Sequence, residues 1–439
     1  MKLDKETAKA LDAAWNHKAA KASLERWMDI CASENWGKIP DDLPMLATVF
    51  GASWYLTRFI FFRGDTAATL IDQPFSLESR LEYLSSRFQR DSADGDFENN
   101  LHRLHLIKNE IMLQIMLAQL KGEFDQVRTE QALTRLAEAV LQTMIMLCGV
   151  DREADGQFVV LGMGRMAGLE MIYGSDLDLI VLGQDNTQDV FERIGKAVRK
   201  MLRMIAAVDP AGGLYEVDMR LRPHGNAGTL ISPLNTFIDY HAEGREIWER
   251  QMMTRYRPVA GDNKLSSEVT ARLMPSIYSG YDDEHLRNEI KKMRQLVQHE
   301  LGCPLGKYDI KRGKGGIMDI DFITHYLQLL YGHENPALQT ASTRNALHQL
   351  GDTGVLQQET AATLLESYDF LKMLESRLRV FDMKSISQFS DNPEDITALA
   401  RAMGFYEGSA REAAVGFLEC YLNTIHSVRQ QFEEIIGWD

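Results

Sequence analysis

The 439-residue sequence has few of the features that mark secreted, membrane-spanning or nucleic-acid-coating proteins. Its four cysteines, Cys31, Cys148, Cys303 and Cys420, lie far apart and form no CxxC pair, so neither a zinc ribbon nor a thioredoxin-type site is indicated. The N-terminus has no apolar signal core. The most apolar stretch, residues 46–62, is interrupted by Arg58 and predicts a buried helix rather than a membrane span.

The charge balance and the unpaired cysteines indicate what the protein binds and where it is located. Asp and Glu number 63 against 48 Lys and Arg, which gives a formal net charge of −15. A protein that coats nucleic acid needs a basic face, so we expect no nucleic-acid partner. Unpaired cysteines are typical of a reducing cytoplasm, which is the expected location. No internal repeat or low-complexity segment is present.

The pattern of apolar residues changes twice along the chain. Helical spacing runs through the first 150 residues or so, gives way to short β-branched runs, and returns after residue 258. We therefore predict an α+β, mostly helical fold with a central α/β domain. The predicted domains are an N-terminal helical domain (1–125), the α/β domain (126–280) and a C-terminal helical bundle (281–439), in line with a length that suggests about three domains.

Individual elements follow from the same patterns. Strands are predicted at residues 158–162, 177–183 and 214–221, and helices at about 129–147, 189–205, 284–301, 321–332, 357–383 and 408–436.

Three glycines in residues 162–168 suggest a dinucleotide-binding fold as the first interpretation of the α/β domain. They follow a strand, and Asp185 stands about twenty residues further on, as that fold requires. The spacing is GxGxxxG rather than GxGxxG, however, and leaves room for a crossover helix of only two turns. Asp176 and Asp178 would also begin an interior parallel strand, where unpaired buried carboxylates cost several kcal/mol each. This interpretation is therefore disfavoured.

The acidic pair Asp176 and Asp178 favours a second interpretation, a metal-dependent nucleotidyl-transfer site. Side chains alternate along a strand, so these two carboxylates point to the same side. Two like charges repel at that separation, and such a pair is stable mainly when a divalent cation lies between them. The alternating run 214–221 adds Asp218. Three acids from two strands can hold the two metal ions that clamp the oxygens of a phosphoryl displacement.

Two other interpretations of the acidic pair remain open. A DxD sequence also carries the nucleophile of haloacid dehalogenases. There the acids follow a strand and Thr or Val stands two residues beyond the second Asp, where this chain has Ile180. The pair also fits a purely structural role as the cap of an element, although Asp218 on a second strand argues against it.

Four ordered stretches resemble the glutamine synthetase adenylyltransferase family, which belongs to the DNA polymerase β-like nucleotidyltransferase superfamily. They read GMGRMAGLEMIYGSDLDLIVL, LYEVDMRLRPHGNAG, WERQMMTRYRPVAGD and YDIKRGKGGIMDIDFITHYLQLLYGHENPAL. The superfamily pattern is a glycine pair, about ten residues, Dx[DE] and later a lone acid between apolar residues. Gly164, Asp176, Asp178 and Asp218 match it. The resemblance is strongest over residues 100–340 and makes the central domain the nucleotidyltransferase domain.

The resemblance implies transfer of AMP from ATP to a tyrosine of glutamine synthetase, with Mg²⁺ or Mn²⁺ as cofactor. The well-known members are about twice this length and have two halves, one that adds AMP and one that removes it by phosphorolysis to give ADP. This chain holds one catalytic set, so both directions stay open and transfer is favoured. A third alternative is a non-catalytic module that senses nucleotide or binds a PII-type signalling protein, which is also an expected partner.

The resemblance also implies roles for individual residues. Asp176, Asp178 and Asp218 are the expected catalytic and metal-binding residues, and Asp218 would help to deprotonate the attacking hydroxyl. The candidate nucleotide-binding residues are Gly162, Gly164, Arg165, Ser175, Arg220, Arg222 and Lys311. The glycines would expose backbone amides to a triphosphate. For the two later arginines the alternative is an ion pair with Glu216 or another acid, and for Lys311 it is a solvated hairpin turn.

A second group of arginines stands in the stretch 248–257. Arg250 and Arg257 are seven residues apart on a predicted helix and would share one face. That face would either meet nucleotide phosphates or form ordinary ion pairs with Glu246 and Glu249.

Overall fold

A computed structural model describes residues 4–33, 39–91, 96–184, 188–243, 246–300 and 306–438. Asp185 and Cys303, named above, lie outside these ranges. Most of the described residues are helical and the strands form two small sheets, so the predicted α+β, mostly helical fold class is confirmed. No helix within the described ranges is long and apolar enough to cross a membrane.

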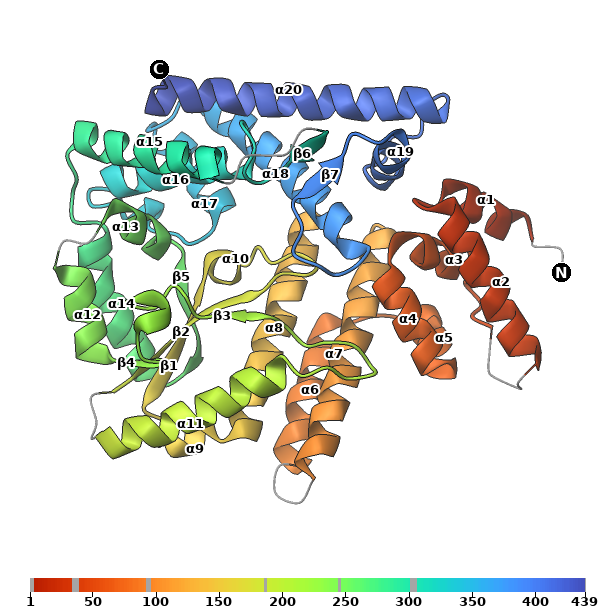
Figure 1. Ribbon diagram of the computed structural model, residues 1–439, viewed down its shortest axis with the longest axis horizontal. Coiled ribbons are helices and arrows are strands. Elements are labelled where there is room, and N and C mark those ends of the chain that lie inside the picture. The colour runs from red at the N-terminus through yellow and green to blue at the C-terminus, as the bar shows by residue number, and fades with distance from the viewer. Residues whose placement is uncertain are drawn as a thin grey trace.

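Helices alone build the N-terminal part of the chain. They are α1 (Lys5–Ala13), α2 (His17–Ser33), α3 (Leu43–Ala52), α4 (Trp54–Arg63), α5 (Asp65–Asp72), α6 (Leu77–Asp91), α7 (Phe97–Leu120), α8 (Gln126–Cys148) and α9 (Val150–Glu153). This part runs in Figure 1 from α1 to α5 on the right, through α6 to α8 in the middle, to α9 at the lower left. The apolar stretch 46–62 is not the single helix that we predicted. Ser53 is extended between α3 and α4, and its hydroxyl accepts from the amide of Leu56 at 3.2 Å, so it caps a second helix.

The central part carries the main sheet. Its elements are β1 (Phe158–Met163), α10 (Gly164–Ala167), β2 (Leu177–Gly183), α11 (Gln188–Ile205), β3 (Val217–Asp218), β4 (Ile231–Pro233), α12 (Leu234–Ala242), α13 (Ile247–Met253), β5 (Tyr256–Gly261) and α14 (Asn263–Ile277). The strand predicted over 214–221 pairs with its neighbour only at β3. The helix predicted through residue 257 ends at Met253, and β5 follows it.

The order of the main sheet is β3-β2-β1-β5, and β4 also pairs with β2. β1 is antiparallel to both β2 and β5, whereas β2 is parallel to β3 and β4. A dinucleotide-binding fold needs a parallel crossover between its first two strands. The antiparallel pairing of β1 with β2 therefore rules out the first interpretation of the glycine-rich stretch.

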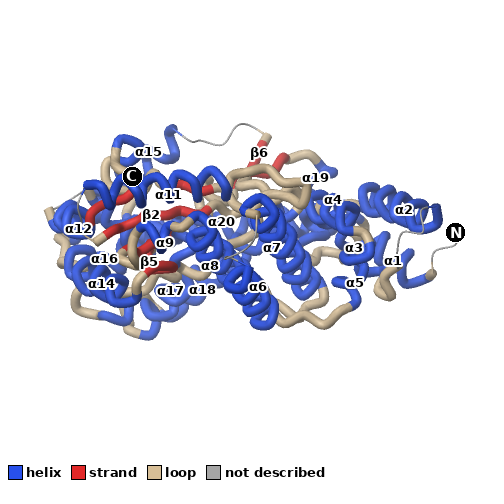
Figure 2. The backbone as a smooth tube through the Cα atoms, turned by 90° about the horizontal axis from the view of Figure 1, so that it is seen from below, coloured by secondary structure: helices blue, strands red, loops and turns tan. Residues whose placement is uncertain are grey.

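The C-terminal part returns to helices. They are α15 (Asp283–Glu300), α16 (Ile317–Tyr331), α17 (Thr343–Asp352), α18 (Gln358–Val380), α19 (Pro393–Ala402) and α20 (Ala410–Ile436), and the strands β6 (Lys307–Asp309) and β7 (Gln388–Ser390) form a small antiparallel sheet. The sequence did not predict α17 or α19. In Figure 1 this part lies above the main sheet, and Figure 2 shows the strands among the surrounding helices.

Alternating side chains of β1 and β2 supply two different hydrophobic cores. Phe158 and Val160 join a core that they share with the N-terminal helices, and Val159 and Leu161 join a second core that α12, α13 and α14 share with the C-terminal helices. In β2 the residues Leu177, Leu179 and Val181 face the first core, whereas Ile180 and Leu182 face the second. Because the period of a strand is two, Asp178 points to the same side as Ile180 and Leu182. The acidic pair therefore faces the C-terminal helices. The three-domain division of the chain stays a prediction.

Candidate active site

The three acids named from the sequence come together at one edge of the main sheet. Asp178 and Asp218 are register partners on the parallel strands β2 and β3, and Leu177 pairs with Val217 beside them. The amide of Leu177 donates to the carbonyl of Glu216 at 2.8 Å. The short strand β3 thus places Asp218 directly next to Asp178, and Asp176 stands two residues earlier on the same chain.

The pKa of Asp178 is affected by both of the other acids. Burial, followed by the charges of Asp176 and Asp218, raises the pKa of Asp178 to about 7. Lys311 and Arg165 oppose this shift without cancelling it. A buried carboxylate among like charges favours protonation or a bound cation. The donor set therefore has the chemistry that a divalent metal requires.

Asp218 has a different environment from Asp178. Its two oxygens accept from Arg220, through the backbone amide at 2.8 Å and through Nε at 2.8 Å and Nη2 at 2.5 Å. The side-chain hydrogen bond from Arg220 lowers the pKa of Asp218 despite partial burial. Within the described residues, no three His, Cys, Asp or Glu side chains form a ready-made metal cluster. The three-acid metal site thus stays a prediction.

Cations face the acids from the other side of the site. Arg165 follows β1 on α10, Lys311 follows β6, and Arg379 lies near the end of α18. The charge of Arg165 and burial lower the pKa of Lys311, and no hydrogen bond or ion pair among the described residues engages its ammonium group. Carboxylates can bind a divalent metal and cations can bind phosphates, so a site with both is suited to a metal-bound nucleotide.

Glu375 holds this group of cations together. Its side chain is fully buried on α18, and Arg165 donates to it at 2.7 Å while Arg379 donates at 2.7 Å. Burial alone would raise its pKa, but Arg165 and Arg379 together lower the pKa of Glu375 to about 2. The sequence did not single out Glu375 or Arg379, because they lie about 200 residues from the acids and belong to no local motif.

Gly162 and Gly164 are both tightly packed, and a contact of their amides with a triphosphate stays a prediction. A Cβ on Gly162 would lie 2.9 Å from Val259 and 3.1 Å from Met166. Gly164 has φ +55°, and a Cβ there would lie 3.4 Å from the Oδ2 of Asp178. The amide of Gly164 already donates to the carbonyl of Arg255 at 2.9 Å, so it is engaged within the fold.

Ser175 and Arg222 are likewise engaged by their own loops. The hydroxyl of Ser175 accepts from the amide of Ile172 at 3.0 Å and closes the turn before Asp176. Arg222 donates to the carbonyl of Met219 at 2.5 Å. Arg220 has the ion pair that was its alternative, although with Asp218 rather than Glu216. Its side chain is 72% exposed, and a contact to a nucleotide stays a prediction for all three residues.

The arginines of 250–257 form internal contacts. Arg250 donates to the carbonyl of Ser276 at 2.8 Å, and Arg257 pairs with Glu138. Arg255 pairs with the buried Glu170, which also accepts from Tyr368 at 2.9 Å. The expectation of a shared helical face was wrong, since α13 ends before Arg255.

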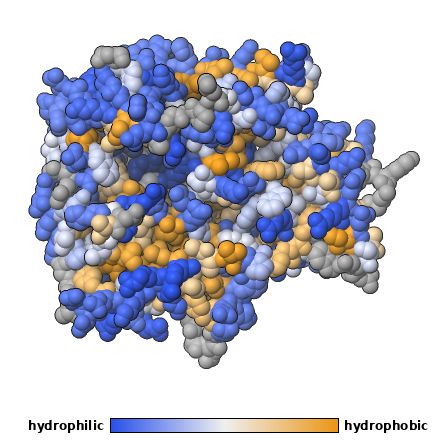
Figure 3. Space-filling model, in the orientation of Figure 1, coloured by the Kyte–Doolittle hydropathy of each residue, from blue (hydrophilic) through white to orange (hydrophobic). Residues whose placement is uncertain are grey.

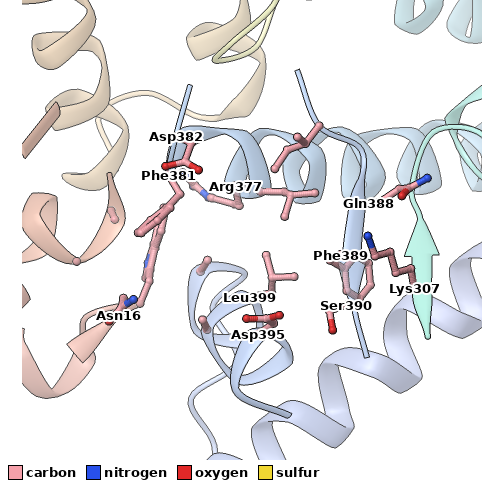
Figure 4. Close-up of a pocket in the computed structure, with 17 residues that line it drawn as sticks. Asn16, Lys307, Arg377, Phe381, Asp382, Gln388, Phe389, Ser390, Asp395 and Leu399 are labelled. Atoms are coloured by element: carbon pink, nitrogen blue, oxygen red, sulfur yellow. The ribbon is translucent and has the colours of Figure 1, made fainter. Parts of the chain in front are cut away.

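Figure 3 shows a hollowed, hydrophilic area below the C-terminal helices. Asp176 lines a cavity of about 680 Å³. The cavity in Figure 4 is a different one, of about 420 Å³, between the N-terminal helices and the end of α18. Arg377 lines it and lies over the ring of Trp15 at 5.1 Å. None of the predicted site residues lines that cavity.

The raised pKa of Asp178 predicts how a metal affects stability at different pH. Between pH 4 and pH 7, Asp178 keeps its proton in the folded chain but has released it in the unfolded chain. Its contribution to the free energy of unfolding therefore falls as pH rises through this range and stays constant above pH 7. A divalent cation should relieve this penalty only where Asp178 is ionised. We expect Mg²⁺ to raise the unfolding temperature more at pH 8 than at pH 5, as measured by calorimetry with K⁺ as control. An equal rise at both pH values would contradict this.

Comparison with known proteins shows the family. Residues 43–272, more than half of the chain, match the family model described as Glutamate-ammonia ligase adenylyltransferase. Residues 285–436 match the model described as GlnD PII-uridylyltransferase. The chain thus belongs to the glutamate-ammonia ligase adenylyltransferase family, and the resemblance found in its motifs is confirmed.

Curated relatives are similar over most of this chain. The bifunctional glutamine synthetase adenylyltransferase/adenylyl-removing enzyme of Aromatoleum aromaticum is 29% identical over 393 residues, which is 84% of this chain and 40% of that protein. The protein of the same name from Streptomyces coelicolor is 29% identical over 405 residues, 89% of this chain and 39% of that protein. The chain therefore spans about two fifths of the length of these relatives.

Proposed function

We propose that this chain is a metal-dependent nucleotidyltransferase that moves AMP from ATP to a tyrosine of glutamine synthetase. One observation carries the proposal: Asp176, Asp178 and Asp218 meet at a sheet edge that faces Arg165 and Lys311. Family membership and the names of the relatives support the same reaction.

Asp176, Asp178 and Asp218 would hold Mg²⁺ or Mn²⁺, which when bound would neutralise phosphate charge and lower the pKa of the acceptor hydroxyl. The tyrosine oxygen forms a bond to the α-phosphorus of ATP, the bond from that phosphorus to the bridging oxygen breaks, and pyrophosphate leaves. Arg165 and Lys311 offset the charge that develops on the leaving group. Asp218 accepts the proton of the hydroxyl.

Removal of AMP is the second candidate, because the printed names of the relatives include both activities. In that direction phosphate would replace the tyrosine as nucleophile and ADP would be released. A PII-type protein is a further proposed partner, supported only by the match of residues 285–436 to a family named for it.

A paired assay tests the direction. The chain is incubated with glutamine synthetase, Mg²⁺ and α-labelled ATP, and in parallel with adenylylated synthetase and phosphate, each with and without a PII-type protein. Label on the synthetase supports transfer, and released ADP supports removal. ATP binding without either product would indicate a non-catalytic module.

The control is the double variant Asp176→Asn with Asp178→Asn. Because loss of one electrostatic stabiliser typically costs about 10²–10³ in rate, we expect the double variant to lose at least about 10³-fold. Retained activity in that variant would show that the metal site is placed wrongly.

A further inference from the structure

Helix α7 turns a polar face toward the loop that precedes β3. Its neighbouring residues are mostly apolar, yet His105, Lys108 and Asn109 are buried within it. Burying such groups is costly unless each finds a hydrogen-bond partner. The groups that hydrogen-bond to these three side chains therefore indicate the role of this face.

Three successive carbonyls of the loop accept from this face. Asn109 donates to Ala211 at 3.0 Å, the Nδ1 of His105 lies 2.6 Å from the oxygen of Gly212, and Lys108 donates to Gly213 at 3.0 Å. A carbonyl only accepts, so Nδ1 carries the hydrogen in this arrangement. The hydroxyl of Tyr55 adds a bond to the Oδ1 of Asn109 at 2.9 Å, so α4 supports the same contacts.

Lys108 has no acid to offset its charge within this group. Burial lowers its pKa to about 7. Its ammonium group lies 5.9 Å from the ring of Tyr55 and 5.1 Å from the ring of Tyr215. Two ring faces, the carbonyl of Gly213 and the Oδ1 of Asn109 at 3.4 Å supply the compensation, and the first of these carbonyls ties this lysine to the loop.

The loop leads within five residues to Asp218. The strand β3 that carries Asp218 has only two residues, and its pairing with β2 consists of two register pairs. So short a strand sets little register by itself. The loop also walls a cavity of about 680 Å³ that Asp176 lines, so a shift of the loop changes the surroundings of that acid as well.

We propose that His105, Lys108 and Asn109 are positioning residues, which hold residues 211–213 so that β3 places Asp218 beside Asp178. The proposal rests on the proposed function only in taking Asp218 as a metal ligand. We call this set of three side chains the α7 clamp.

Two adjacent glycines provide a matched test. Gly212 has φ +105°, and a Cβ there would lie 2.3 Å from the hydroxyl oxygen of Tyr55. At Gly213 a Cβ would meet nothing within 4 Å. Gly212→Ala should therefore displace the loop from the α7 clamp without changing any charge, whereas Gly213→Ala should leave it in place.

Mn²⁺ binding, measured by electron paramagnetic resonance without nucleotide, is the first readout, and turnover is the second. Supporting residues of a metal site typically change affinity by about 10–100-fold. We expect Gly212→Ala to weaken Mn²⁺ binding and turnover about tenfold, and Gly213→Ala to stay within about twofold. Lys108→Met is a second variant with the same expected loss, and thermal unfolding shows that each variant is folded.

Equal Mn²⁺ affinity in folded Gly212→Ala, Lys108→Met and wild type would overturn the clamp. So would a wild-type chain that binds no Mn²⁺. If wild type binds Mn²⁺ but transfers no AMP, the binding comparison still decides the clamp, while the proposed function fails on its own.

Discussion

Replacing Asp178 by Asn is expected to abolish AMP transfer and at the same time to raise the stability of the fold. Burial and the acidic neighbours raise the pKa of the Asp178 carboxylate to about 7, so its ionised form at pH 8 opposes folding. At roughly 1.4 kcal/mol for each pH unit between the unfolded and folded pKa, the penalty is about 4 kcal/mol at most. Asn keeps the shape and removes the charge, so we expect the unfolding temperature at pH 8 without metal to rise by a few degrees.

Asp218→Asn is the matched control for this result. It removes a second acid from the same site, and activity should again be lost. Arg220 lowers the pKa of Asp218, however, so the ionised form of this residue stabilises the fold. Removing Asp218 also relieves Asp178 of one like charge, so calorimetry should give a clearly smaller gain in unfolding temperature for Asp218→Asn than for Asp178→Asn. A fall in stability for Asp178→Asn would contradict the described electrostatics.

Glu375→Gln is expected to damage both the fold and the site. Its carboxylate is fully buried between Arg165 and Arg379, and removing one partner of a buried ion pair typically costs about 3–5 kcal/mol because the remaining charge is uncompensated. Arg165 would also lose the contact that holds it near the acids. We expect a loss of about 3 kcal/mol in urea unfolding, and a raised KM for ATP under conditions where the variant is still folded.

The exposed Glu366 on the same helix supplies the control. Glu366→Gln makes the same chemical change away from the cations, and surface substitutions of this kind usually stay within about 0.5 kcal/mol. An unchanged KM for ATP in folded Glu375→Gln would show that this residue has only a structural role.

The sequence predicted the parts of the site that are local. The strands β1 and β2 follow from β-branched runs, and the acids follow from their i, i+2 spacing. β5 was missed because the stretch before it has helical spacing and α13 ends only at Met253. The strand predicted over 214–221 was too long, since Gly225 and the preceding residues turn away after Asp218.

The cationic side of the site could be predicted only in part. Arg165 and Lys311 stand in motifs, but Glu375 and Arg379 reach the acids through the packing of α18, which no local pattern indicates. The same holds for the α7 clamp. Its residues were visible as polar interruptions of an apolar helix, yet their partners lie about 100 residues later in the chain.

Successive side chains of β1 and β2 enter two different hydrophobic cores, so both faces of these two strands are buried. A chain cut after residue 280 would keep α12 and α14 beside β1 and β2, but it would lose the C-terminal members of their second core, among them Ile317, Ile320 and Tyr326. It would also lack Lys311, Glu375 and Arg379. Two of the cations beside the acids, Lys311 and Arg379, therefore come from a part of the chain that the acidic motif does not contain.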